Sequence, residues 1–254
     1  MPELKPLWPN NQRPTVSLQE WRAPKPNGTG VLVCPGGGYG ALATGHEGDD
    51  IARYLNERGF DAWVLRYTIA SAQTPGPLLE KPLADAQRAL RQIHYGPNAP
   101  QKLGIWGFSA GGHLAATVST QWQKPIEDAP PLRPDFSILA YPVITMDAWT
   151  HGGSRHNLLG PTPTPEQIER FSNERQVNAQ TPPTFLFHTA DDGAVPVENA
   201  LRYALALEKH KVPCELHSYR SGPHGVGLAA NHPALKSWGE LLERWLSSFV
   251  ENTK

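Results

Sequence analysis

A serine stands between glycines in the stretch "GFSAGG", residues 107–112, at the spacing that a nucleophilic serine requires. A serine hydroxyl attacks poorly until a histidine removes its proton, and an acid must orient that histidine. With 23 glycines in 254 residues, the pattern arises by chance in roughly one chain in ten. Ser109 is therefore a candidate nucleophile only if a strand precedes it, a helix follows it, and an acid and a histidine come later.

Two aspartates and a histidine follow Ser109 in suitable places. Asp191 and Asp192 come directly after the apolar segment "TFLFHTA", and His224 lies in the glycine-rich stretch "SGPHGVG". The chain order serine, aspartate, histidine is the order found in α/β-hydrolases. Neighbouring side chains on an extended loop point in different directions, so one aspartate reaches the histidine. The other is expected to cap the helix that begins near Val197.

Three other histidines fit structural roles better than catalytic ones. His188 and His217 lie within expected strands, where a hydrogen-bonded core or sheet-face histidine is the usual finding. His113 lies on the helix that follows the candidate nucleophile, and we interpret it as structural too.

Acyl transfer also needs hydrogen-bond donors for a negatively charged oxygen. The stretch "CPGGGYG", residues 34–40, supplies closely spaced backbone N–H groups after an apolar run. The N–H of Gly37 or Gly38 would pair with that of Ala110 as an oxyanion hole. A glycine run can instead hold a phosphate, but this one lacks the GxGxxG spacing and the lysine of a P-loop.

Apolar runs alternate with amphipathic segments along the whole chain. Expected strands lie at 15–21, 31–35, 62–67, 102–108, 135–144, 184–190 and 214–219. Expected helices lie at 46–60, 83–95, 110–122, 197–210 and 233–249, with an irregular stretch from 145 to about 183.

This alternation predicts the α/β class, with a mostly parallel sheet covered by helices on both faces. No repeat and no linker divides the chain, so we expect one domain over residues 1–254, without a large lid domain. Ligands bind at the carboxyl ends of parallel strands, where the loops after residues 34, 108, 190 and 219 all lie.

The composition excludes several classes of protein. Lysine and arginine total 23 against 24 acidic residues, which leaves no charge signature for nucleic acid or an anionic membrane. The partner should be a small or neutral molecule. Cys34 and Cys214 lie in apolar runs and are expected to be buried and reduced.

No run of 18 apolar residues and no export signal is visible in the sequence. We therefore expect a soluble protein, located in the cytoplasm or exported with a signal that is missing from this chain. No metal-ligand spacing occurs, and the expected chemistry needs no cofactor.

Several segments together resemble the small acetyl xylan and feruloyl esterases of the α/β-hydrolase group, over nearly the whole chain. They are "PGGGYGALATGHEGDDIARYLNERGF", "GFSAGGHLAAT", "GSRHNLLG", "TPPTFLFHTADDGAVPVEN" and "GPHGVGL". The segment "HYGPNAPQKLG" is shorter than the family's usual connection, but it lies away from the expected site.

The resemblance implies Ser109 as nucleophile, Asp191 as acid and His224 as base. Asp191 is preferred to its neighbour because the pair Val195-Pro196 follows it at the distance seen in related hydrolases. Substrate contacts are expected from Tyr39 and from Trp149.

Trp149 lies in the stretch "MDAWTHGGSRHNLLG", which should edge the pocket. Two interpretations of its ring have equal weight. The ring stacks on a sugar or ferulate ring, or it packs against the loop that carries it.

The implied function is a serine carboxylesterase that removes acetyl, and also feruloyl, groups from decorated xylan or xylo-oligosaccharides. Nothing resembles the opposed carboxylates of a glycosidase. The alternatives are a prolyl-oligopeptidase-like peptidase, disfavoured because this chain shows no propeller, and a generic short-chain esterase. A further alternative is a catalytically inactive hydrolase fold that acts as a receptor.

Overall fold

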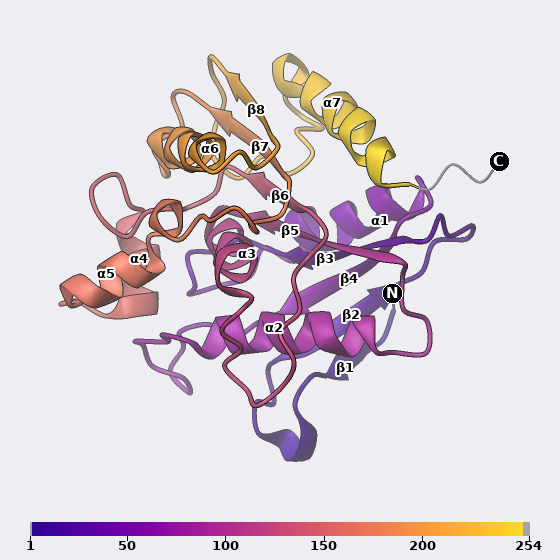
Figure 1. Ribbon diagram of the computed structural model, residues 1–254, viewed down its shortest axis with the longest axis horizontal. Helices are drawn as coiled ribbons and strands as arrows, with labels where there is room; N and C mark the ends of the chain where they lie inside the picture. The colour runs from indigo at the N-terminus through magenta and orange to yellow at the C-terminus, as the bar shows by residue number, and fades with distance from the viewer. Residues whose placement is uncertain (1, 251–254) are drawn as a thin grey trace.

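The computed structural model describes residues 2–250, which form one eight-stranded sheet flanked by helices (Figure 1). The strands are β1 (Leu4–Pro6), β2 (Ser17–Trp21), β3 (Thr29–Cys34), β4 (Asp61–Arg66), β5 (Lys102–Phe108), β6 (Ser137–Ala140), β7 (Thr184–Thr189) and β8 (Cys214–Tyr219). The α-helices are α1 (Asp50–Asn56), α2 (Lys81–His94), α3 (Ser109–Gln121), α4 (Gly152–Leu159), α5 (Pro165–Phe171), α6 (Glu198–Lys209) and α7 (Ser237–Leu246). The two ends of the predicted domain, residue 1 and residues 251–254, lie outside the described part.

The sheet is parallel except at one edge. Its strand order is β1-β2-β4-β3-β5-β6-β7-β8. β2 pairs antiparallel with both β1 and β4, while β3 to β8 all run parallel to one another. The predicted mostly parallel sheet is confirmed. The sequence analysis missed β1, whose three residues are all exposed.

Helices cover both faces of the sheet, as predicted, and each face has its own apolar core. On one face α2, α3 and α6 bury leucines such as Leu90, Leu114 and Leu207. On the other face α1 and α7 bury side chains such as Ile51 and Trp238. Continuous burial of β3 and β5 to β7 follows from this two-sided cover.

Three expectations about local structure are corrected. The predicted irregular stretch contains two helices, α4 and α5. The predicted strand 135–144 ends at Ala140, because Tyr141 takes a positive φ of 37° and turns the chain. Cys34 is buried as expected, but Cys214 is exposed because it begins the edge strand β8.

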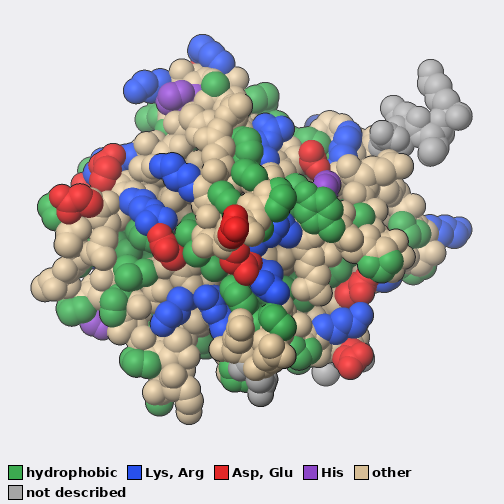
Figure 2. Space-filling view, turned by 60° about the horizontal axis from the view of Figure 1, so that its bottom comes forward, with side chains coloured by type: hydrophobic (Ala, Val, Ile, Leu, Met, Phe, Trp, Pro, Cys, Tyr) green, Lys and Arg blue, Asp and Glu red, His purple; other side chains and the backbone are tan. Residues whose placement is uncertain are grey.

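On the surface drawn in Figure 2, basic and acidic side chains are interspersed among apolar ones. This mixture agrees with the formal net charge of −1. No helix among residues 2–250 is long and apolar enough to cross a membrane.

Candidate active site

Ser109 lies at a sharp turn between β5 and α3, as the sequence predicts. Phe108 is extended, with φ −118° and ψ 132°, whereas Ser109 has a positive φ of 51°. Non-glycine residues adopt this conformation at a cost, and it is found mainly at functional sites. The turn presents the serine side chain at the carboxyl edge of the sheet.

The glycines around the serine are needed for close packing. A Cβ atom on Gly107 would lie 2.1 Å from the carbonyl oxygen of Gly111. A Cβ atom on Gly111 would lie 2.1 Å from the carbonyl oxygen of Cys34. A larger residue would push α3 away from β5 at Gly107 and away from the end of β3 at Gly111, so the glycine spacing has a steric cause.

Ser109, His224 and Asp192 form a continuous hydrogen-bonded chain. The Nε2 atom of His224 lies 2.8 Å from Oγ of Ser109, and its Nδ1 lies 2.7 Å from Oδ2 of Asp192. An ionised carboxylate only accepts hydrogen bonds, so Nδ1 carries the proton and Nε2 accepts from the serine hydroxyl. This tautomer is the one that a general base needs.

The structure corrects the choice between the two aspartates. Asp191 is exposed and accepts hydrogen bonds from Oγ of Ser221, at 2.6 Å, and from N–H of Gly222, at 2.8 Å. The Asp192 side chain is 1% exposed and faces His224. The first aspartate points outward and braces the loop that precedes the histidine, so the prediction that Asp191 contacts His224 is wrong.

Asp192 is held ionised by its surroundings. Burial alone would raise the pKa of this carboxyl, but hydrogen bonds from His188 and His224 and from N–H of Val195 and Ala194 outweigh it and hold the pKa well below its usual range. The two backbone bonds to Oδ1 are 2.9 Å long. They fix the carboxylate in the turn that leads into α6.

The other singled-out histidines are structural, as predicted. His188 is fully buried in β7, and its Nε2 lies 2.9 Å from the carbonyl oxygen of Val195 and 3.4 Å from Oδ2 of Asp192. His217 pairs with Glu215 at 2.6 Å on the edge strand.

His113 is buried on α3. Its Nε2 lies 2.8 Å from the carbonyl oxygen of Phe171, and burial lowers its pKa to about 4. It is therefore a neutral core histidine near neutral pH.

The glycine loop after β3 runs directly past Ser109, the candidate nucleophile. A Cβ atom on Gly36 would lie 2.9 Å from Cβ of Ser109. The N–H of Gly36 already donates to Glu47, at 2.7 Å, so it is not a free donor. Gly37 and Gly38 follow with positive φ of 130° and 63°, and Ala110 lies in the first turn of α3, where an N–H has no partner within the helix.

Tyr39 does not face a substrate pocket, which corrects that prediction. Its side chain is 1% exposed, and its hydroxyl lies 2.8 Å from Nδ1 of His113. The positive φ of 60° at this residue turns the ring inward, against the rings of Tyr67 and His113.

Trp149 lies on the loop after β6 with its side chain partly in solvent, at 45% exposure. The Arg202 guanidinium lies 4.3 Å from the centre of its ring, and Asn199 donates to its carbonyl oxygen at 2.8 Å. The exposed ring is thus held in place from the side of α6.

The sequence analysis did not single out His151, which lies two residues after Trp149. Its Nδ1 accepts from the N–H of Ser154, at 3.1 Å, and begins α4. A Cβ atom on Gly38 would lie 3.5 Å from Cε1 of this ring. Burial and the charge of His224 lower the pKa of His151, so a neutral imidazole lies at the edge of the candidate site.

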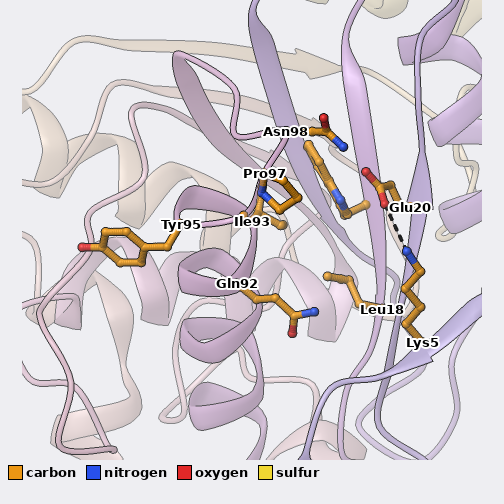
Figure 3. Close-up of a pocket in the computed structure, with 10 residues that line it drawn as sticks. Lys5, Leu18, Glu20, Gln92, Ile93, Tyr95, Pro97 and Asn98 are labelled. Atoms are coloured by element: carbon orange, nitrogen blue, oxygen red, sulfur yellow. Dashed lines mark ion pairs between the residues drawn. The ribbon is translucent and has the colours of Figure 1, made fainter.

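A separate cavity of about 480 Å³ opens at the opposite end of the sheet, beside the end of α2 (Figure 3). Lys5 and Glu20, on the neighbouring strands β1 and β2, form an ion pair of 3.5 Å at one side of it, and Tyr95 points away from the other labelled residues. Its lining holds no serine, cysteine, histidine or aspartate. The chemistry-bearing residues are therefore at the carboxyl ends of the strands, not in this cavity.

The strand order, with helices on both faces of the sheet, defines the α/β-hydrolase fold, and a serine, a histidine and an aspartate are hydrogen-bonded at its carboxyl edge. The chain belongs to the prolyl oligopeptidase family, whose model matches residues 83–249. The α/β-hydrolase fold predicted from the sequence is confirmed by solved structures that cover nearly the whole chain.

An acetyl ester-xyloside bifunctional hydrolase from Caldicellulosiruptor lactoaceticus is 38% identical, with a TM-score of 0.85 over 97% of this chain and 96% of that chain. A sugar hydrolase from Lactococcus lactis is 29% identical, with a TM-score of 0.79 over 99% of this chain and 100% of that chain.

Two curated relatives carry names that refer to xylan. An acetylxylan esterase of Xylanibacter ruminicola is 34% identical over 232 residues, which is 88% of this chain and 46% of that protein. Endo-1,4-beta-xylanase B of Butyrivibrio fibrisolvens is 38% identical over 217 residues, which is 82% of this chain and 34% of that protein. The chain thus spans about a third to a half of the length of these relatives. The predicted resemblance to acetyl xylan esterases is confirmed.

Proposed function

We propose that the protein is a serine carboxylesterase that removes acetyl groups from acylated xylan or its oligosaccharides. The observation that carries this proposal is the hydrogen-bonded chain from Ser109 through His224 to Asp192, with contacts of 2.8 and 2.7 Å. The acetylxylan esterase and the acetyl ester-xyloside hydrolase among the similar proteins support the choice of acyl group and polymer. Feruloyl esters are the second acyl class that we propose.

In the acylation step, Oγ of Ser109 attacks the ester carbonyl carbon while Nε2 of His224 takes the hydroxyl proton. The carbonyl oxygen becomes an oxyanion, and the imidazole becomes an imidazolium that the Asp192 carboxylate stabilises through Nδ1–H. Collapse of the tetrahedral intermediate breaks the bond to the sugar oxygen, which takes the proton from Nε2 and leaves as the alcohol.

In the deacylation step, a water molecule attacks the acyl-Ser109 ester and gives its proton to His224. The second intermediate then releases the carboxylic acid, and the serine oxygen recovers the proton from His224. Atoms and charges balance without a cofactor or a metal, since water is the only co-reactant.

We propose the N–H groups of Gly37 or Gly38 and of Ala110 as donors to the oxyanion. The glycine loop passes the nucleophile, and the Gly36 N–H is occupied by a carboxylate. Ala110 begins a helix, whose N-terminal dipole also favours a negative charge. The loss of one such donor typically costs about 10²–10³ in kcat.

Trp149 is the proposed stacking surface for the sugar or the aromatic acyl group. Its ring is partly exposed and is fixed by the Arg202 guanidinium, so stacking costs little ordering entropy. Trp149→Ala should therefore raise KM for xylo-oligosaccharide esters more than for p-nitrophenyl acetate.

The main test compares wild type with Ser109→Ala on acetylated xylan, methyl ferulate and a p-nitrophenyl ester series. We expect the variant to lose about 10³–10⁶ of kcat and to escape labelling by a fluorophosphonate, while Ser119→Ala on the same helix α3 keeps both. A Ser109→Ala protein with a tenth of the wild-type rate would overturn the nucleophile assignment.

The same preparation separates the alternative functions. A prolyl peptide substrate tests the peptidase, and unacetylated xylan and an aryl xyloside test glycosidase activity. Equal rates on all short-chain p-nitrophenyl esters, with none on acetylated xylan, would favour a generic short-chain esterase. A folded wild-type protein that no fluorophosphonate labels would favour the inactive receptor.

A further inference from the structure

A buried carboxylate beside the candidate site has no role in the mechanism proposed above. Glu47 lies in a π-helical turn, Gly45–Asp49, just before α1, and its side chain is 3% exposed. Burial of a carboxylate is costly unless hydrogen bonds or charges compensate for it. Its ionic neighbour is the half-exposed imidazole of His46, at 3.7 Å, so hydrogen bonds must provide most of the compensation.

One carboxylate oxygen of Glu47 holds the glycine loop. Its Oε2 accepts the N–H of Gly36 at 2.7 Å. A Cβ atom on Gly36 would lie 2.7 Å from this oxygen and 2.9 Å from Cβ of Ser109. The carboxylate, the glycine loop and the nucleophile are therefore packed in direct succession.

The other oxygen holds the loop of the catalytic histidine. Oε1 accepts the hydroxyl of Tyr141 at 2.7 Å, and the same hydroxyl accepts the N–H of Gly227 at 2.9 Å. The Tyr141 ring packs edge-on against His224, with ring centres 4.9 Å apart. Tyr141 thus connects Glu47 both to the backbone and to the ring of the proposed base.

We propose that Glu47 is a positioning residue that fixes the oxyanion loop and the histidine loop relative to each other and whose negative charge favours the protonated state of His224 during catalysis. This proposal rests on the proposed function. It assigns a role to a residue that contacts neither the substrate nor the reacting atoms.

The charge argument depends on the other groups that face His224. Asp192 contacts Nδ1 directly, and His151 lies at the edge of the site on the loop before α4. His46 lies on the far side of Glu47 and is half-exposed, and Tyr141 lies between Glu47 and His224. The Glu47 carboxylate is thus the second negative charge, after Asp192, that we place near the protonated His224 ring. The neutral Tyr141 side chain lies between the two.

The test is Glu47→Gln, which keeps the shape of the side chain but removes its charge. The amide has one accepting oxygen in place of two, so it accepts from Gly36 or from Tyr141 but not from both, and the other contact is lost or reversed in direction. We expect kcat to fall about 10- to 100-fold with KM changed less than about threefold. The midpoint of the acid limb of the kcat/KM profile should move to lower pH by about half a unit or more, because the imidazolium loses a favourable charge.

Two further variants separate these effects. Tyr141→Phe removes the link between the loops but no charge, so we expect a loss of about tenfold in kcat with the acid limb unmoved. Asp85→Asn changes a buried carboxylate that binds Trp8, Arg13 and Thr68 and has no hydrogen bond to Glu47 or to the Ser109–His224–Asp192 chain. It should lower Tm and leave kcat and the pH profile as in wild type.

The proposal is overturned if Glu47→Gln keeps kcat within twofold of wild type or leaves the acid limb in place. If Glu47→Gln does not fold, Tyr141→Phe decides: kcat within twofold of wild type overturns the coupling. A wild-type protein without esterase activity would instead overturn the proposed function itself, which the parallel wild-type assay on p-nitrophenyl acetate detects.

Discussion

Asp192 and Asp191 are neighbours in the chain with opposite environments, and this difference allows a paired test. We expect Asp192→Asn to lower kcat by about 10⁴, because an amide favours the wrong imidazole tautomer and cannot stabilise the imidazolium. Asp191→Asn weakens the bracing of Ser221 and Gly222 and should leave kcat within about tenfold of wild type. Steady-state kinetics of both variants provide the test, and the opposite ranking would return the acid to Asp191.

Asp192 also makes stability depend on pH. Its pKa is depressed in the folded protein, despite burial, by the bonds from His188 and His224. Its contribution is therefore fully present above the ordinary carboxyl pKa of about 4 and is lost as pH falls toward the lower folded-state value. The difference in unfolding free energy between wild type and Asp192→Asn should shrink as pH falls below about 4, where the Asp192 carboxylate begins to lose its charge. Denaturant titrations at fixed pH measure it, and a difference that grows as pH falls below about 4 would contradict the expectation.

Tyr39 should affect stability rather than catalysis. Tyr39→Phe leaves the buried Nδ1 of His113 without its partner, which should lower the unfolding free energy by about 1–3 kcal/mol. Activity on p-nitrophenyl acetate should remain within about twofold of wild type. Tyr95→Phe, at an exposed tyrosine, is the matched control for both measurements. A large loss of kcat at unchanged Tm would contradict this expectation and favour a contact between the Tyr39 hydroxyl and the substrate.

At the scale of elements, the glycine loop contains two adjacent positions that differ in their tolerance of a side chain. A Cβ on Gly37 would lie 2.2 Å from the carbonyl oxygen of Ala41, at φ 130°. A Cβ on Gly38 would have its nearest neighbour at 3.5 Å, on His151, at φ 63°. The first position cannot accept alanine without moving the loop, and the second can.

Gly37→Ala should therefore lower kcat by about 10²-fold or more through displaced oxyanion donors. Gly38→Ala should cost about 1–2 kcal/mol of stability from its left-handed backbone, with a smaller kinetic effect. Both variants keep every N–H, so the comparison isolates loop conformation. Equal kinetic losses would show that the loop does not supply the donors in the way proposed.

The two unpredicted helices show which local signals were available. α5 begins with a capping box, in which the Thr164 hydroxyl accepts from N–H of Gln167 and the Gln167 side chain accepts from N–H of Thr164, and Pro165 is its first residue. The letters "TPEQ" carry that signal, so this helix was predictable. α4 is capped by the ring of His151, an unusual cap that no sequence rule would have indicated.

At the scale of the whole molecule, the parallel sheet was predictable because its buried strands are continuous apolar runs separated by amphipathic helices. The triad geometry was less so. His224 follows β8, and β6 and β7 lie between β8 and β5, so the His224 loop must cross the ends of both strands to reach Ser109. Tyr141 supports that crossing from the end of β6, and its role depends on a backbone turn that the sequence pattern did not indicate.

The choice of aspartate failed for a related reason. Both carboxylates follow β7 at the carboxyl edge, and the spacing to Val195-Pro196 favoured Asp191. Burial decides between them: the Asp192 side chain is 1% exposed, beneath His224, whereas Asp191 lies in solvent. Side-chain direction within a turn depends on tertiary packing, which is not encoded in a local pattern.

The left-handed backbone conformation of Ser109 is expected to favour the proposed catalysis at the expense of thermal stability. The turn is held at φ 51° by the packing of β3, β5 and α3, whether or not the hydroxyl is present, so the fold carries this strain at the proposed nucleophile. Among inactive variants, Ser109→Gly should therefore have a higher Tm than Ser109→Ala. Its unfolding free energy should be larger by up to about 1 kcal/mol. Calorimetry of the two proteins measures the free-energy cost of the positive φ at residue 109. An equal or lower Tm for the glycine variant would mean that the turn is unstrained. If the expectation holds, a homologue without the activity gains stability from glycine at this position. Glycine there would then indicate that the activity has been lost.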